Sequence, residues 1–498
     1  MLAAPLGELV DLLIALDTRA DEPLHRQLYR GVREAIRSGR LRPGVRIPST
    51  RRLAQHLGVS RWTVLAAFDQ LVAEGYVVGA VGSGSRVAFE LPDPMPDPVE
   101  LPPATTDVPA RQARLSGRGR LLQGIRHRPG VPYPKPFWTG IPPVDEFPVR
   151  LWARLAARRY RRLGQTELYH GPAAGYQPLR EAIVAHLRAA RGVRASAGQV
   201  VVVASAQEAM ELAARLLLDP GDTAWIEDPS WPGARGALTG AGARIVPVPV
   251  DSDGLSVERG IALAPEGRLA YVCPSHQYPA GVTLGAERRQ ALLAWADSHD
   301  AWILEDDYDS EYLHAKRPLT ALQGLDQAGR VLYIGTFNKT LFPALRLAYL
   351  VLPENLVEPF LAVRGIGGQH APTIDQAVLT DFLAEGHFAN HMRRMRTLCR
   401  ARRDLLIAAA AREVPDLLEI ARTDGGLHAI GWLPPGMDDR QASVAAERAG
   451  VRAAALSAYY LGTCPRPGLV LGYAGFGRHQ IESAMRRLGG ALRSVAPR

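Results

Sequence analysis

Lys339 stands in the stretch "RVLYIGTFNKTLFPALRLAYLVLP", which runs from residue 330 to residue 353. It is one of only three lysines in a 498-residue chain that carries 59 lysines and arginines in all. Arginine stays charged at any ordinary pH, whereas a desolvated lysine can lose its proton and attack a carbonyl as an amine. The chemistry that this stretch suggests is a Schiff base between Lys339 and an aldehyde.

An aldehyde cofactor such as pyridoxal 5'-phosphate (PLP) makes further demands on the chain. It needs an acid at its ring nitrogen, a partner for its ring hydroxyl, an aromatic face and a phosphate cradle. Asp306 and Tyr308 in "ILEDDYDSEY" supply the acid and a phenol. Gln277 or Tyr278 in "PSHQYPAG" can also reach the ring hydroxyl.

The aromatic face and the phosphate cradle also have candidates. Trp231 in "EDPSWPG" can stack on the ring. Ala206 and Gln207 begin an expected helix, whose first backbone amides suit a phosphate. Thr336 and Arg346 lie three residues before and seven residues after Lys339, and Arg346 can form a charge-assisted pair with the phosphate.

These candidates follow apolar runs that we expect to be strands. The expected strands are residues 200–204, 223–228, 243–250, 269–274, 301–306, 331–337 and 345–352. Helical stretches separate several of them, which predicts an α/β fold with a mainly parallel sheet and helices on both faces. A smaller α/β subdomain is expected after about residue 381. Because ligands bind at the carboxyl ends of such strands, the candidate residues should meet there.

A second group of candidates lies near the N-terminus. A short helix at 49–59, capped by Ser49 or Thr50, a turn at Gly58 and a helix from Ser60 to Gly75 predict a helix-turn-helix. Two short strands follow at 76–89, as in a winged helix. The expected DNA contacts are Arg51, Arg52, Ser60, Arg61, Trp62, Thr63, Ser83 and Arg86. We expect Arg61 to contact guanine or phosphate, and Arg51 and Arg52 to contact phosphate.

Prolines divide the chain. Those at 92, 94, 96, 98, 102, 103 and 109 prevent regular structure and indicate a linker. The expected organisation is an amphipathic segment at 1–20, a DNA-binding domain at 21–89, a linker at 90–131 and a cofactor-binding domain at 132–498. Residues 21–90 hold eleven arginines against six acidic residues, which favours an anionic partner.

The remaining composition excludes several classes of protein. The three cysteines, Cys273, Cys399 and Cys464, are widely separated, so neither a disulfide framework nor a metal site is expected. No apolar run reaches the length that spans a membrane. These features favour a reduced, cytoplasmic setting without membrane partners.

The two expected domains of this chain resemble two known folds. "GVRIPSTRRLA" and "VSRWTV" resemble the GntR-type winged helix, and "TFNKTLFPALRL" and "EDDYDSEY" resemble the type I aminotransferase fold. Their fusion is similar to the MocR-type transcription regulators. The resemblance implies a homodimer that binds double-stranded promoter DNA and holds PLP on Lys339. It also implies that Tyr169 of "YHGPAAGYQPLREAI" approaches the phosphate in the partner's site.

The nature of the response stays open at this point. Aminotransferases hold the substrate carboxylate with an arginine just before a late strand, where this chain has Leu469 in "PRPGLVLGYAG". We expect a regulator, rather than an enzyme, that senses an amine or amino-acid effector or PLP itself. The alternatives are an active aminotransferase with an appended DNA-binding domain and a domain that has kept the fold without the cofactor.

Overall fold

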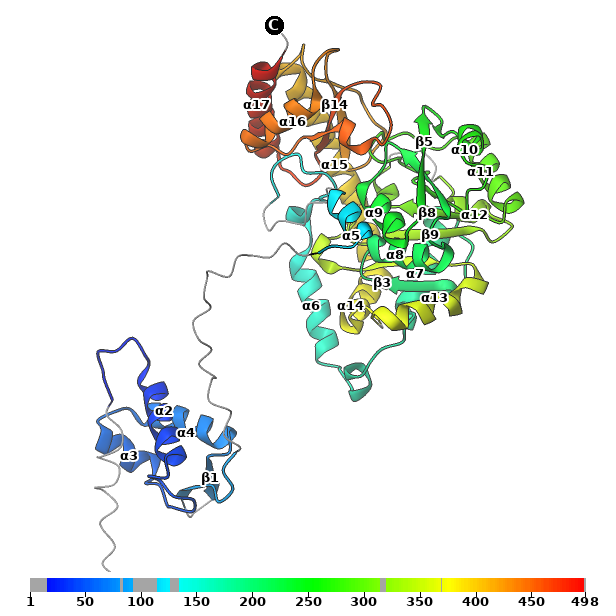
Figure 1. The fold of residues 1–498 in the computed structure, drawn as a ribbon. Coiled ribbons are helices and arrows are strands. Elements are labelled where there is room, and N and C mark those ends of the chain that lie inside the picture. Colours follow the sequence, from blue (N-terminus) through cyan, green and yellow to red (C-terminus); the bar gives the residue numbers. More distant parts are fainter. Residues whose placement is uncertain are drawn as a thin grey trace, which may run out of the picture. The chain divides into compact units, whose positions relative to one another are not determined.

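The computed structural model describes residues 16–80, 84–92, 114–125, 134–313, 319–368 and 370–496. The chain divides into two compact units, Met1–Gln112 and Ala113–Arg498, and each is described by itself (Figure 1). Ser83 of the expected wing, most of the expected linker and most of the expected N-terminal amphipathic segment lie outside the described residues.

The smaller unit is a winged helix-turn-helix. Its elements are α2 (Leu24–Arg37), α3 (Thr50–Leu57), α4 (Arg61–Ala73), β1 (Val77–Ala80) and β2 (Gly84–Val87), and the two strands pair antiparallel. Leu28, Val32 and Ile36 recur at helical spacing on α2 and pack with Val64 and Phe68 of α4 in one core. The expected order of helices and strands is therefore confirmed.

Capping residues set the ends of the two DNA-binding helices. The Ser49 side chain accepts a hydrogen bond from the Arg52 N–H, so Ser49 rather than Thr50 caps α3. Gly58 ends α3 with a φ of 64°, a conformation that glycine adopts without strain. Ser60 caps α4 by accepting a hydrogen bond from the Thr63 N–H at 3.1 Å.

The larger unit is built on an eight-stranded sheet in the order β3-β10-β9-β8-β7-β4-β5-β6. The strands are β3 (Val200–Val203), β4 (Thr223–Asp228), β5 (Arg244–Asp251), β6 (Gly254–Leu255), β7 (Leu269–Val272), β8 (Trp302–Asp307), β9 (Val331–Thr336) and β10 (Ala348–Val351). Neighbouring strands from β5 to β9 are parallel, whereas β10 runs antiparallel to both β9 and β3. All seven expected strands are confirmed, and the sheet is mainly parallel.

Helices cover both faces of this sheet. One face packs on α8 (Ala206–Leu217), α9 (Pro232–Ala241) and α13 (Glu354–Gly367). The other face packs on α7 (Gln177–Arg191), α10 (Val257–Leu263), α11 (Ala286–Ser298) and α12 (Leu322–Leu325). Successive residues of each strand therefore face different helix layers.

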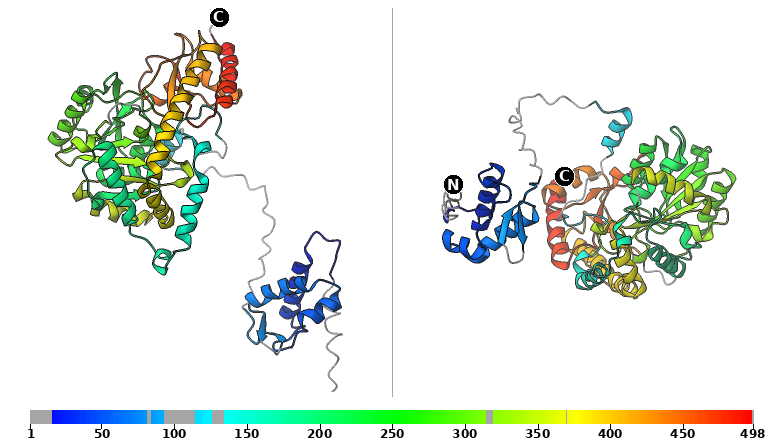
Figure 2. Two further views of the ribbon diagram at one scale, coloured as in Figure 1. Left: turned by 180° about the vertical axis from the view of Figure 1, so that it is seen from behind. Right: turned by 90° about the horizontal axis from the view of Figure 1, so that it is seen from below.

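A smaller α/β subdomain follows the sheet, as expected. The long helix α15 (His387–Glu413) runs from the sheet to this subdomain, which Figure 2 shows from behind. The subdomain holds an antiparallel sheet of β11 (Glu419–Ile420), β12 (His428–Trp432), β14 (Gly468–Gly472) and β13 (Ala454–Ala455), with α16 (Asp439–Arg448) and α17 (Arg478–Val495). The other helices of the unit are α5 (Gly117–Gly124), α6 (Val149–Tyr160) and α14 (Thr373–Ala384).

The described residues contain neither a helix that could span a membrane nor a cluster of metal ligands. None of their helices combines the length and the apolar character that crossing a membrane requires. No cluster of three or more His, Cys, Asp or Glu side chains in the same ranges is arranged to hold a metal ion.

Candidate functional site

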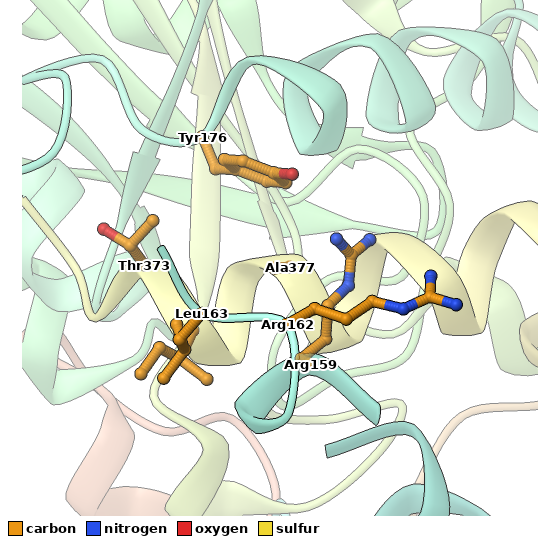
Figure 3. A pocket seen from close by; sticks show the side chains of 7 residues that line it. Arg159, Arg162, Leu163, Tyr176, Thr373 and Ala377 are labelled. Carbon is orange, nitrogen blue, oxygen red and sulfur yellow. The ribbon is translucent and has the colours of Figure 1, made fainter. Parts of the chain in front are cut away.

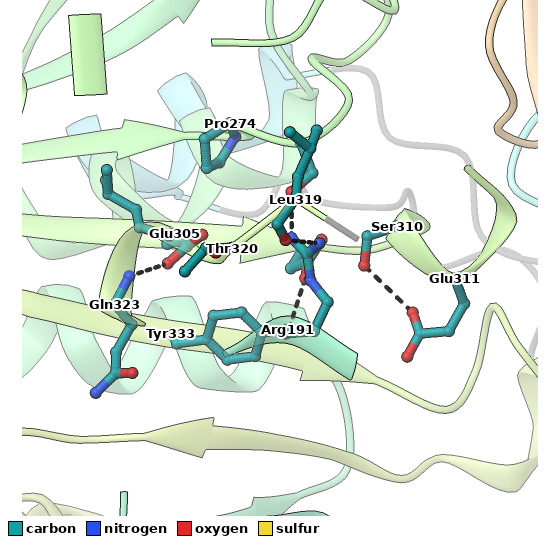
Figure 4. A network of polar contacts seen from close by, with 12 residues as sticks. Arg191, Pro274, Glu305, Ser310, Glu311, Leu319, Thr320, Gln323 and Tyr333 are labelled. Carbon is teal, nitrogen blue, oxygen red and sulfur yellow. Dashed lines mark hydrogen bonds and ion pairs between the residues drawn. The ribbon is translucent and has the colours of Figure 1, made fainter. Parts of the chain in front are cut away.

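The end of β8 carries three acids in a row, and the pleat separates them. Glu305 and Asp307 point to one face of the sheet, where Glu305 accepts hydrogen bonds from the Leu322 and Gln323 N–H groups. Asp307 accepts hydrogen bonds from Arg191 at 2.8 Å and from the Tyr333 hydroxyl at 2.6 Å. Arg191 also donates to the Leu319 carbonyl, and Figure 4 shows this network. These buried groups anchor the strand end.

Asp306 points to the opposite face and is bonded on one side only. Its Oδ2 accepts a hydrogen bond from the Tyr271 hydroxyl at 2.7 Å. Its Oδ1 is buried and has no partner among the described residues. Burial raises the pKa of Asp306 to about 7, against a lowering by the Tyr271 hydrogen bond. An unpaired carboxylate oxygen in the interior favours a cationic N–H group beside it.

The amine of Lys339 lies at the same end of the sheet. Its Nζ donates a hydrogen bond to the Gly140 carbonyl at 2.9 Å. Burial lowers the pKa of Lys339, although the Asp306 and Asp309 carboxylates act in the opposite direction. A Cβ atom at Gly140 would lie 2.6 Å from Nζ, so a larger residue there would displace the amine. Burial therefore shifts the Lys339 amine toward its uncharged form.

Phenols gather in the segments after β7 and β8, where the ring centroids of Tyr278 and Tyr308 lie 5.9 Å apart. The Tyr308 hydroxyl lies 3.1 Å from Nδ1 of His276. The Tyr278 hydroxyl lies 3.1 Å from Thr139 Oγ1 and donates to the Tyr459 hydroxyl at 3.3 Å. Gln277 is engaged elsewhere, because its Nε2 donates to the Pro229 carbonyl at 2.7 Å and to the Tyr278 carbonyl at 2.9 Å. Both residues expected at a ring hydroxyl, Gln277 and Tyr278, therefore have hydrogen-bond partners among the described residues, and the choice between them stays open.

The expected phosphate cradle lies around the start of α8 and the loop after β9. Ala206 and Gln207 occupy the first turn of α8, where backbone N–H groups have no carbonyl one turn earlier to bond. Thr336 ends β9, and its Oγ1 accepts a hydrogen bond from the Asn338 N–H at 3.1 Å. Arg346 is exposed.

Asn338 holds this loop in shape, a role that the sequence alone did not reveal. Its side-chain oxygen accepts a hydrogen bond from the Leu347 N–H at 3.0 Å, across the loop that carries Lys339. Its Nδ2 donates to the Ala204 carbonyl at 3.4 Å, next to the start of α8. The only available signal was the position of a short polar residue directly before the lysine.

Trp231 and Tyr169 complete the set of expected residues. Trp231 directly precedes α9, and a Cβ atom at Gly233 would lie 2.4 Å from its ring and 2.6 Å from Gln207 Oε1. Glycine at 233 thus brings Trp231 and the start of α8 together. Tyr169 is 74% exposed, so its ring is not part of the core.

The position of Leu469 differs from the expectation for a late-strand clamp. Leu469 is fully buried in the core beneath α16 and α17. Its neighbour Val470 points to the other side of β14, where it packs near Tyr459. Tyr459 bonds Tyr278, one of the expected cofactor residues, so Val470 is the β14 residue on the side of the candidate site. Leu469, one residue earlier, faces the other way because successive side chains of a strand alternate. Neither side chain can bind a carboxylate.

The start of α4 forms the second candidate site, on the smaller unit. Arg51, Arg52, Arg61 and Trp62 are exposed, and Trp62 is 77% exposed. Ser60 and Thr63 hydrogen bond to each other at 2.8 Å, which leaves Arg61 and Trp62 as the free side chains of the first turn. Arg86 on β2 is also exposed and donates to the Gly44 carbonyl at 3.3 Å.

A separate pocket lies away from these residues. It is lined by Arg159, Arg162, Leu163, Tyr176, Thr373, Ile374 and Ala377, from α6, α14 and the segment before α7 (Figure 3). Arg159 binds the Asp381 carboxylate, and none of the expected cofactor residues lines this pocket. It has no part in the sites described above.

Comparison with known proteins identifies the family. The family of aminotransferases class I and II matches residues 139–487, and the gntR family of bacterial regulatory proteins matches residues 24–87. The chain is 40% identical to the probable rhizopine catabolism regulatory protein MocR of Rhizobium meliloti, over 96% of each chain. This chain belongs to the MocR-type transcription regulators. It is a DNA-binding regulator with an aminotransferase-like domain.

Another relative and a solved structure are similar to this chain. The chain is 34% identical to the pyridoxine biosynthesis transcriptional regulator PdxR of Corynebacterium glutamicum, over 95% of this chain and 96% of that one. The α-aminoadipate aminotransferase LysN of Thermus thermophilus, solved with N-(5'-phosphopyridoxyl)-L-leucine, is similar with a TM-score of 0.67 and 28% identity. The match covers 76% of this chain and 95% of LysN. The aminotransferase class I and II fold implies dependence on PLP.

Proposed function

We propose that this MocR-type regulator binds PLP through Lys339 and changes its binding to promoter DNA when an amine effector, or PLP itself, occupies the site. The observation that carries the proposal is Oδ1 of Asp306, a buried and unpartnered carboxylate oxygen close to a lysine with a lowered pKa. A protonated pyridine nitrogen is the group that such an oxygen would receive. Nothing in the packing of an apolar core requires this pair.

The residues present fit PLP. Lys339 would hold its aldehyde, Asp306 its ring nitrogen, and Tyr308 and Tyr278 its ring hydroxyl. Trp231 would cover the ring, and a cradle of Ala206, Gln207, Thr336 and Arg346 would hold the phosphate. When bound, PLP supplies an electrophilic carbon that captures primary amines, together with a ring that withdraws electrons.

The chain's own residues prepare this capture. The Gly140 carbonyl orients the Lys339 amine, and burial favours its uncharged, nucleophilic form. With PLP bound, Asp306 would hold a proton on the ring nitrogen, because a cation in contact with this carboxylate favours its charged form. The Asn338 bridge keeps the amine and the start of α8 in fixed relation.

The second half of the proposal concerns the dimer and DNA. The exposed Tyr169 supports a homodimer in which this ring approaches the partner's phosphate. The exposed Arg61 and Trp62 support base contacts in the major groove, and Arg51, Arg52, Thr63 and Arg86 support contacts to the backbone. Effector binding would then act by shifting the population of dimers able to engage an operator.

One experiment tests these statements together. Purified full-length protein is titrated with PLP and then with candidate amines while visible absorbance is recorded, and binding to the promoter region beside its own gene is measured with and without PLP. We expect an absorbance band that Lys339→Ala abolishes, and DNA affinity that changes with PLP or an amine. A colourless protein would refute the cofactor proposal, and sustained turnover of ordinary amino acids would refute the regulator in favour of an aminotransferase.

A further inference from the structure

His276 is a buried histidine that the functions proposed above do not use. It lies in the segment after β7 and is 4% exposed. Its Nδ1 is 3.0 Å from the Asp309 carboxylate and 3.1 Å from the Tyr308 hydroxyl. Its Nε2 is buried and has no hydrogen-bond partner in the described part of the chain. The residue therefore links an acid to the phenol of Tyr308, which the proposal above places at the cofactor's ring hydroxyl.

Two glycines fix the imidazole in this position. A Cβ atom at Gly281 would lie 3.1 Å from Nε2, and one at Gly426 would lie 2.3 Å from Cε1 of the ring. Gly426 precedes β12 in the smaller subdomain, and its carbonyl accepts a hydrogen bond from Tyr473 at 2.8 Å. The imidazole is thus enclosed on both sides, and Nδ1 stays directed at Asp309 and Tyr308.

The partners determine where the proton sits. An ionised carboxylate only accepts hydrogen bonds, so Nδ1 beside Asp309 carries a hydrogen. That N–H is shared between the Asp309 carboxylate and the Tyr308 oxygen, which then accepts rather than donates. The hydrogen of Tyr308 is consequently free to be donated in another direction.

The surrounding charges support this arrangement. Burial lowers the pKa of His276, but the Asp309 carboxylate outweighs burial and raises it above the ordinary value. His428 on β12 lies 5.4 Å away between ring centroids, and burial and His276 lower its pKa to about 4, so it stays neutral. Tyr278 packs against His428, and the phenols of Tyr278 and Tyr308 have pKa values well above normal and stay protonated.

We propose that Asp309 and His276 form a positioning pair that turns the Tyr308 phenol into a hydrogen-bond donor toward the cofactor's ring hydroxyl. The inference rests on the proposed binding of PLP. Asp309 fixes the hydrogen on Nδ1, Nδ1–H is donated to the Tyr308 oxygen, and Tyr308 donates its own hydrogen to the ring oxygen. Such a donor stabilises the anionic ring oxygen and thereby favours loss of a proton from the bound chromophore.

The test is the pH at which the visible band of the PLP-loaded, full-length protein changes. His276→Asn keeps an N–H close to the position of Nδ1, whereas His276→Phe keeps the ring shape and loses the donor. We expect His276→Phe to move the transition upward by about one pH unit, the size of one hydrogen bond. The transition of His276→Asn should stay near that of the wild type. The transition of Asp309→Asn should also move upward, because Nδ1 of His276 can then accept the hydrogen of Tyr308.

Controls separate this inference from the proposal on which it rests. His299→Asn removes an exposed histidine at the end of α11 and should leave the transition unchanged. An unshifted transition in both His276→Phe and Asp309→Asn, with PLP still bound, would overturn the positioning pair alone. If His276→Phe fails to fold, Asp309→Asn decides. A wild-type protein without any band would overturn the binding of PLP and this inference together.

Discussion

At pH 8, Asp306→Asn should stabilise the cofactor-free protein while it weakens cofactor binding. In the folded state the pKa of Asp306 is about 7, against 3.8 for the free side chain. The unfolded chain therefore releases this proton at lower pH than the folded chain does. Below pH 3.8 Asp306 does not lower the free energy of unfolding. The loss of stability that it causes grows as pH rises from 3.8 to about 7 and is constant above that.

The size of the effect follows from the pKa difference. Each pKa unit corresponds to about 1.4 kcal/mol, so the cost to the free energy of unfolding is roughly 1–2 kcal/mol at pH 5 and about 4 kcal/mol at pH 8. Asparagine carries no charge, but its amide also leaves one buried group unpaired, at a cost of about 1–3 kcal/mol at every pH. The pH-dependent part is therefore the clearer signal. The free energy of unfolding of the variant relative to wild type should rise by roughly 3 kcal/mol between pH 5 and pH 8.

The assay is urea unfolding of PLP-free, full-length protein at both pH values, followed by tryptophan fluorescence. Added PLP should raise the midpoint of wild type much more than that of Asp306→Asn. Asp307→Asn is the matched control on the same strand. This substitution breaks a buried ion pair with Arg191 and should lower the free energy of unfolding by about 3–5 kcal/mol, whereas Asp306→Asn should raise it at pH 8. Equal pH dependence in Asp306→Asn and wild type would refute the reasoning.

Three further predictions concern other parts of the chain. Lys339→Ala should abolish the PLP-dependent absorbance band but leave DNA-free folding intact, as measured by circular dichroism. Arg61→Ala should weaken binding to the preferred DNA sequence by about 1–3 kcal/mol and relax sequence preference. Arg52→Ala should weaken binding to all sequences and lower the salt slope by about one. Both are measured by fluorescence anisotropy, and equal effects would contradict the placement of the start of α4 in the major groove. Gly426→Ala combines a φ of 86° with a Cβ atom 2.3 Å from His276, so it should lower the urea midpoint by the equivalent of at least about 1 kcal/mol.

Local rules explain why much of the fold could be predicted. Apolar runs between helical stretches gave the seven strands, and short polar residues before helices gave the caps at Ser49 and Ser60. Spacing placed Lys339 and Asp306 at the same end of the sheet. These features depend on a few neighbouring residues and on the periodicity of the backbone.

Contacts between distant segments could not be predicted in the same way. His276 and Asp309 lie 33 residues apart and meet because β7 and β8 are neighbours. Asn338 bonds Ala204 across more than a hundred residues, and its type gave no hint of that partner. The choice between Leu469 and Val470 depended on the pleat of β14, which a short apolar run does not specify.

The alternation of Glu305, Asp306 and Asp307 also limits how this strand can evolve. A deletion of one residue within Trp302–Asp307 would keep most of its composition but exchange its two faces. Asp306 would then face Arg191, and its neighbours would face Lys339. The acid expected at the cofactor and the acids that hold the strand end would each lie on the wrong face of the sheet. Single substitutions can be repaired one at a time, but such a shift has no intermediate that keeps either function. The length of β8 is therefore constrained more tightly than its sequence, and an alignment of working relatives should contain no gap there.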